Sequence, residues 1–277
     1  MRLGGPVHEP YSEPEEWARA VRALGYSAAY CPVDSAASDD VPKAFAAAAQ
    51  EYDIAIAEVG AWRNPLSPDD SARKSAVEFC KVQLDLADRI GARCCVGISG
   101  SRGEQWDGPH PYNLTPDTFA LVVDTVREII DAVKPRRTCY TLETMPWMYP
   151  DSPQSYLDLI RAIDRPAFAV HLDPVNLVCS PQRYFNNAGL IRECFELLGA
   201  HIKSCHAKDI RLSGKLTTHL DEVRPGLGGL DYRAYLTELA RLPDVPLMLE
   251  HLPTPGEYAA AADYIRSVAD SLGLRFA

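Results

Sequence analysis

Short apolar runs alternate with amphipathic segments along the whole chain. Within the amphipathic segments, apolar residues recur at helical spacing, as in Trp17, Val21 and Leu24. The intervening runs are too short for ordinary helices and are rich in alanine, valine and isoleucine, which indicates buried strands. We predict eight strands: Arg2–His8, Ala28–Val33, Ile54–Val59, Arg93–Ile98, Arg137–Glu143, Ala167–Asp173, Lys203–His206 and Pro246–Glu250.

Strict alternation of strand and helix predicts parallel strands with helices packed on them. Eight such units within 277 residues, with no break in composition, predict a (β/α)₈ TIM barrel that forms a single domain over residues 1–277. The alternative is a doubly wound open sheet. No Gly-x-Gly-x-x-Gly follows an early strand, which disfavours that alternative.

Four of the predicted strands end in polar side chains, namely Glu143, Asp173, His206 and Glu250. Such ends on apolar strands are unfavourable unless they meet one another or a ligand. In a barrel, the carboxyl ends of consecutive strands surround one mouth, so we expect the four side chains to converge. A mixed oxygen and nitrogen set suits one divalent metal ion: Mn²⁺, Mg²⁺ or Co²⁺, with Zn²⁺ tolerated. The alternative is four isolated, solvated strand ends.

Aromatic residues follow other strands on the same side. Trp62 comes directly after the third strand, and Trp106 lies in the long connection 99–114 after the fourth. Both can offer a flat face to a sugar ring, and His8 at the end of the first strand is a further substrate-facing residue. The alternatives are a Trp62 packed beneath the third helix and a connection that is only a surface insertion.

Strand alternation places Lys208 on the same face as His206, and His171 on the same face as Asp173. Lys208 is therefore a candidate substrate-binding residue, with a solvated or ion-paired lysine as the alternative. His171 lies deeper and is expected to be a core histidine. The long connection 210–230 follows the seventh strand, and long loops on this side of a barrel commonly form lids or substrate walls.

Composition limits the partners of the chain. Its net charge is −10 and it has no basic stripe, which argues against nucleic acid. No apolar run reaches the ~18 residues of a membrane span, and the N-terminal residues do not resemble a signal peptide. The eight cysteines lack Cys-x-x-Cys spacing and are expected to be reduced thiols. We therefore expect a cytoplasmic protein without membrane partners, and leave assembly into a homo-oligomer open.

Several of these motifs together resemble the xylose-isomerase-like TIM-barrel superfamily, and within it the sugar phosphate isomerase/epimerase branch. The resemblance follows element order over essentially the whole chain. It implies that Glu143, Asp173, His206 and Glu250 bind one divalent ion, commonly Mn²⁺, and that the two glutamates act as the acid/base pair. The motifs are Leu142-Glu143, His171-Leu172-Asp173, Cys205-His206-Ala207-Lys208-Asp209, Pro225-Gly226-Leu227-Gly228-Gly229-Leu230-Asp231-Tyr232 and Leu249-Glu250.

One position departs from the family pattern. Ketose epimerases and endonuclease IV usually carry a histidine three residues after the aspartate of the sixth strand, where this chain has Asn176. An asparagine can hydrogen-bond a sugar hydroxyl but is a poor metal ligand. This departure weakens the interpretation of the chain as a typical ketose 3-epimerase. It weakens the interpretation as a trinuclear-zinc endonuclease even more.

The expected function is therefore a divalent-metal-dependent isomerase or epimerase that acts on a small carbohydrate-like substrate. A Lewis-acidic metal makes the proton beside a carbonyl removable by a carboxylate, for which Glu143 and Glu250 are the candidates. The alternatives are a metal-dependent lyase or dehydratase, an endonuclease IV-type phosphodiesterase, and a non-catalytic binding protein.

Overall fold

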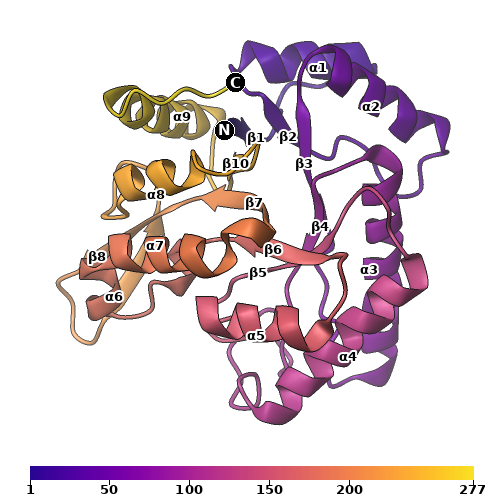
Figure 1. Ribbon diagram of the computed structural model, residues 1–277, viewed down its shortest axis with the longest axis vertical. Coiled ribbons are helices and arrows are strands. Elements are labelled where there is room, and N and C mark those ends of the chain that lie inside the picture. The colour runs from indigo at the N-terminus through magenta and orange to yellow at the C-terminus, as the bar shows by residue number, and fades with distance from the viewer.

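The computed structural model describes residues 1–277 and shows a closed barrel of eight parallel strands (Figure 1). The last strand pairs with the first, with Leu247 opposite Leu3, and this pairing closes the ring. The predicted single-domain (β/α)₈ barrel is confirmed. Its strands are β1 (Arg2–Gly5), β2 (Ala28–Tyr30), β3 (Ala55–Gly60), β4 (Cys94–Gly97), β5 (Tyr140–Glu143), β6 (Phe168–Leu172), β7 (Ile202–Ala207) and β10 (Pro246–Leu249).

Helices surround the barrel, and their apolar faces pack on the strands. Proline stands at the first position of several of them, after a capping residue such as Thr115, Ser152 or Thr254. None of the helices combines the length and apolar composition needed to cross a bilayer. The helices are α1 (Pro14–Ala23), α2 (Asp40–Glu51), α3 (Asp70–Ile90), α4 (Pro116–Val133), α5 (Pro153–Ile163), α6 (Pro181–Phe185), α7 (Asn187–Leu198), α8 (Tyr232–Leu239) and α9 (Pro255–Ser271).

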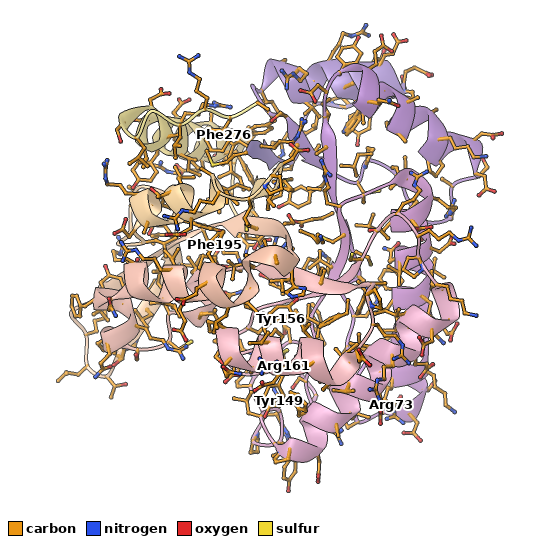
Figure 2. All side chains as sticks on the ribbon, viewed as in Figure 1. Arg73, Tyr149, Tyr156, Arg161, Phe195 and Phe276 are labelled. Carbon is orange, nitrogen blue, oxygen red and sulfur yellow. The ribbon has the colours of Figure 1, made fainter.

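Tyrosine hydroxyls fix the strand ends that carry the polar side chains. Tyr156 points from α5 to the strands (Figure 2), where its hydroxyl lies 2.6 Å from the Leu142 carbonyl and 2.9 Å from the Ala169 carbonyl. On the other side, the Tyr235 hydroxyl of α8 donates to the His206 carbonyl at 2.9 Å. These bonds connect helices to the backbone beside the predicted ligands, so the strand ends are held from outside the barrel.

The connection after β7 is partly regular structure, whereas the sequence predicted a loop over 210–230. Strands β8 (Asp209–Ser213) and β9 (His219–Val223) form an antiparallel hairpin separate from the barrel. The Asp209 carboxylate accepts four backbone N–H groups at 2.8–3.0 Å, from Ile210, Gly226, Gly228 and Leu230. This one buried carboxylate therefore anchors both ends of the hairpin and the glycine-rich segment that follows it.

We expect Asp209→Asn to destabilise the protein by about 1–3 kcal/mol, because an amide nitrogen cannot accept the N–H groups that one carboxylate oxygen receives. Urea unfolding measures the change. Asp221→Asn on the exposed hairpin provides the control and should change stability by less than about 0.5 kcal/mol. An Asp209→Asn variant as stable as this control would contradict the anchoring role.

Candidate functional site

The four polar strand ends meet at the carboxyl end of the barrel. One donor atom each from Glu143, Asp173, His206 and Glu250 lies within 4.8 Å of all the others. The His206 Nδ1 atom is 2.8 Å from Glu250 Oε1, 3.2 Å from Glu143 Oε1 and 3.7 Å from Asp173 Oδ2. The structure thus brings together the residues that the strand pattern selected, although they lie up to 107 positions apart in the sequence.

Lys208 lies at the centre of the same group. Its Nζ atom is 2.5 Å from Glu250 Oε1, 2.8 Å from Asp173 Oδ2 and 3.5 Å from Glu143 Oε1. The side chain is only 2% exposed, so this is a buried ammonium and not a solvated lysine. The Tyr232 hydroxyl donates to the Lys208 carbonyl at 2.8 Å and fixes the backbone from which the side chain extends.

The charges of the site favour the binding of cations. Burial would raise the pKa of Asp173, but Lys208 and His206 outweigh it and hold the pKa of that carboxyl well below its usual range. Burial likewise opposes ionisation of Glu250, yet His206 and Lys208 lower its pKa to about 2. The carboxylates in turn raise the pKa of Lys208 well above its ordinary value, although burial alone would lower it. The Asp173 and Glu250 carboxylates are therefore ionised, and they attract cations.

These residues fit a divalent metal ion. The buried atoms Asp173 Oδ2 and Glu250 Oε1 have no hydrogen bond of good geometry, although the Lys208 ammonium lies close to both. Three carboxylates around one ammonium leave an excess of negative charge that a divalent cation would neutralise. Carboxylate oxygens with one imidazole nitrogen suit Mn²⁺, Mg²⁺ or Co²⁺. Glu143, Asp173, Glu250 and His206 Nδ1 would hold such an ion.

Glu58, which was not among the predicted site residues, lies behind the site. This buried carboxylate of β3 lies 2.9 Å from His171 Nε2 and 3.4 Å from His206 Nε2, and it is hydrogen-bonded to the Ser204 hydroxyl. Burial would raise its pKa, but His171 and His206 lower it. The signal in the sequence is a single carboxylate inside an apolar strand. Its partner His171 is a core histidine, as expected, although its Nδ1 atom has no hydrogen-bond partner.

Glu58 also determines which nitrogen of the His206 ring faces the candidate metal site. Because Nε2 faces Glu58, Nδ1 faces the three carboxylates of the candidate metal site. A carboxylate behind a metal-binding imidazole fixes its tautomer and orientation. Glu58 is therefore a positioning residue for His206.

A cavity of about 530 Å³ lies above these groups. Its lining includes Trp62, Trp106, Asn176 and Lys208, which the sequence offered as candidate substrate-binding residues, together with Glu143 and Glu250. The Asn176 side-chain amide donates to Glu143 Oε1 at 3.1 Å. His8 does not line the cavity. Its ring instead packs at a tilt against that of Tyr258, which does line the cavity, with the centroids 5.1 Å apart and the ring planes at 53°.

Two further lining residues, Glu222 and His251, were not expected. Glu222 comes from β9 of the hairpin and approaches Lys208 Nζ at 3.7 Å, while His251 Nδ1 lies 3.2 Å from Glu222 Oε1. His251 adopts a left-handed backbone conformation with φ of 57° directly after Glu250. The hairpin thus covers one side of the cavity, and this contact cannot be read from local sequence pattern.

We expect Glu58→Gln to weaken Mn²⁺ binding about 10- to 100-fold, the usual range for residues that orient a metal ligand. The reason is that a neutral amide no longer fixes His206 with Nδ1 directed at the site. Calorimetric titration of the purified protein measures the affinity. Glu238→Gln on α8, a mostly buried glutamate paired with Arg241, provides the control. Equal Mn²⁺ affinity of the two variants would contradict the positioning role.

Comparison with solved structures finds the same barrel in proteins of several activities. D-psicose 3-epimerase from Clostridium cellulolyticum H10, solved with D-tagatose, is 18% identical and matches 97% of this chain and 99% of its own, with a TM-score of 0.67. A probable 3-DHS dehydratase from Bacillus anthracis is 15% identical and matches 97% and 99%, with a TM-score of 0.70. Endonuclease IV from Thermus thermophilus is 15% identical and matches 98% and 100%, with a TM-score of 0.74.

At these identities, the structural matches show the fold alone. No curated protein sequence matches the chain significantly. The family model that describes the xylose isomerase-like TIM barrel matches residues 7–268, which is nearly the whole chain. The chain therefore belongs to the xylose isomerase-like TIM barrel family.

Proposed function

We propose that this protein is a divalent-metal-dependent isomerase or epimerase that acts on a small carbohydrate, polyol or keto-sugar. One observation carries the proposal: Glu143, Asp173, His206 and Glu250 present their donor atoms within 4.8 Å of one another beneath a cavity of about 530 Å³. Mn²⁺ is the metal we propose, because the donor set is mainly carboxylate with one imidazole. The eight free cysteines fit the reducing cytoplasm that we propose as its location.

The two glutamates are the proposed acid/base pair. They belong to β5 and to the residue after β10, which are separated by β6 and β7 around the barrel, so they approach a bound ligand from different sides. A divalent ion held between them would polarise the carbonyl and neighbouring hydroxyl of the substrate. One carboxylate then removes the proton from the adjacent carbon, and the other can return a proton to the opposite face.

The walls of the cavity support an uncharged carbohydrate as the substrate. Trp62, Trp106 and Tyr258 supply aromatic surface for the apolar face of a sugar ring, and Asn176 supplies a polar side chain for a hydroxyl. No arginine lines the cavity, and its carboxylates outnumber its basic side chains. A phosphorylated sugar or a DNA backbone would be repelled by this surface, which disfavours the phosphodiesterase alternative.

Dehydration is the second candidate function. The same two glutamates could remove a proton and then protonate a departing hydroxyl, and a probable 3-DHS dehydratase shares the fold. Epimerisation returns the proton to the same carbon, whereas dehydration releases water. The products therefore distinguish the two reactions.

Incubation of the Mn²⁺-loaded protein with a panel of keto-sugars in D₂O tests the proposal. We expect deuterium to enter the carbon beside the carbonyl of a recovered sugar, because solvent exchanges with the proton held by a glutamate. Mass spectrometry and NMR detect the label. An unsaturated product that has lost water would instead identify a dehydratase. Cleavage of abasic-site DNA without any sugar turnover would contradict both reactions.

We expect Glu143→Gln and Glu250→Gln each to lower turnover about 10²- to 10⁴-fold, the usual range for loss of a general acid or base. Glutamine keeps the size and one oxygen donor, so the Mn²⁺ content should fall much less. His206→Ala should lose metal and activity together. Stopped assays with matched metal analysis separate the two effects. A metal-loaded glutamine variant with nearly wild-type turnover would show that its glutamate is only a ligand.

A further inference from the structure

Two adjoining cavities lie at the opposite end of the barrel from the site described above. Each has a volume of about 460 Å³, and they share Gly91, Arg93 and Arg137. Arg93 directly precedes β4, and Lys203 is the second residue of β7, so these cavities open at the amino ends of the strands. Barrel enzymes keep their active sites at the other end.

The charge of these cavities is unusual for a chain with a net charge of −10. No acidic residue lines either of them. Their six basic residues come from segments far apart in the sequence: Lys43, Arg89, Arg93, Arg136, Arg137 and Lys203. A concave surface of one charge sign concentrates ligands of the opposite sign.

Three of the six cations already have carboxylate partners. Arg89 pairs with Asp85 at 2.8 Å and with Asp39 at 3.2 Å, and Arg93 pairs with Asp244. Lys43 pairs with Asp40 at 3.9 Å. The cations that remain for a ligand therefore all line the second cavity.

Three cations of the second cavity have no carboxylate partner. The Arg136 and Lys203 side chains form neither an ion pair nor a hydrogen bond within the protein, and Arg137 donates only to the Arg89 carbonyl, at 3.3 Å. Gly91 makes this placement of Arg137 feasible, because a Cβ atom there would collide with the guanidinium. The three side chains thus line one cavity without an ion-pair partner, and the nearby Asp88 carboxylate accepts the backbone N–H groups of Arg136 and Arg137.

A buried hydroxyl gives a second, independent indication of a ligand. Thr138 lines the same cavity, its residue is 6% exposed, and its Oγ1 atom has no hydrogen-bond partner. An unpaired buried hydroxyl is destabilising, and such groups usually have a partner. An anion among the cations would provide an acceptor for this hydroxyl.

We infer that the second cavity binds a small anion that carries a diphosphate group. A phosphate carries about −1.5 to −2 charges at neutral pH, so two phosphates match the three free cations better than one does. The adjoining cavity has an apolar wall that includes Ala46, Ile54 and Ile90, which suits the organic part of a diphosphate ester. Inorganic pyrophosphate and a nucleotide diphosphate share the diphosphate group that these cations would bind.

Calorimetric titration of the full chain, stripped of metal with a chelator, tests this inference with inorganic pyrophosphate and with ADP. Both anions should bind at low ionic strength. Tighter binding of ADP would identify a nucleotide-type ligand that also uses the apolar wall, and tighter binding of pyrophosphate an inorganic one. We expect Arg137→Gln and Lys203→Gln each to weaken binding about tenfold, and Arg137→Lys to restore part of it.

Three further variants make the result specific. Lys215→Gln, on the exposed hairpin, and His206→Ala, at the other end of the barrel, should bind pyrophosphate like the wild type. Thr138→Val should weaken binding about threefold without lowering thermal stability, because the hydroxyl has no partner inside the protein. Absence of pyrophosphate binding by the wild type, or equal binding by the Arg137→Gln, Lys203→Gln and Lys215→Gln variants, would overturn the inference. Neither result depends on the proposed isomerase activity.

Discussion

The repulsion among three carboxylates, two of them buried and the third mostly buried, is the constraint on which the site depends. Glu143, Asp173 and Glu250 place oxygens within 4.8 Å of one another, where like charges repel by about 4 kcal/mol per pair at an effective dielectric constant near 20. The barrel compensates with the Lys208 ammonium and the His206 imidazole between them. Such an arrangement costs stability unless it serves a cation or a reaction, which is why we regard it as functional.

The surrounding structure holds these charges in place from several directions. The Thr144 hydroxyl donates to the Asp173 carbonyl at 2.6 Å and accepts from the Asp173 amide at 3.0 Å, which ties the end of β6 to that of β5. Tyrosines of α5 and α8 hold the strand backbones from outside, and Glu58 holds the His206 ring from below. The carboxylates therefore cannot relax apart without disturbing bonds between helices and strands.

Much of this arrangement could be predicted from the sequence because strand ends are local features. A short apolar run that ends in Glu143 or Asp173 marks both the strand and the side chain at its carboxyl end. Barrel closure then brings such ends together, which needs no knowledge of individual contacts. The positions of Trp62 and Trp106 in the cavity follow from the same reasoning, since both come after strands.

The remaining features depend on contacts that no local pattern contains. Glu58 interrupts an apolar strand, and only the packed barrel shows that His171 and His206 are its partners. The pairing of β8 with β9 was not expected, because the sequence predicted only a loop over 210–230, although Ser213-Gly214 is a turn signal between the two strands. His8 was expected at the end of the first strand, but β1 ends at Gly5, and His8 contacts the Tyr258 ring and does not line the cavity.

The two ends of the barrel have opposite charge. The mouth at the carboxyl ends collects acidic side chains around one lysine, whereas the cavities at the amino ends collect arginines and lysines without a carboxylate among their lining residues. The candidate metal site and the proposed anion site thus lie at opposite ends of the barrel. Each end can be altered without changing the charge of the other.

The most direct test of the central claim is a crystal structure of the protein grown with Mn²⁺, with anomalous diffraction used to locate the ion. We expect a single strong peak that lies roughly 2.0–2.6 Å from an oxygen of Glu143, Asp173 and Glu250 and from His206 Nδ1. Lys208 should then contact fewer of these oxygens. A peak elsewhere, or Lys208 still in place with no metal bound at saturating Mn²⁺, would show that these four residues do not form the metal site.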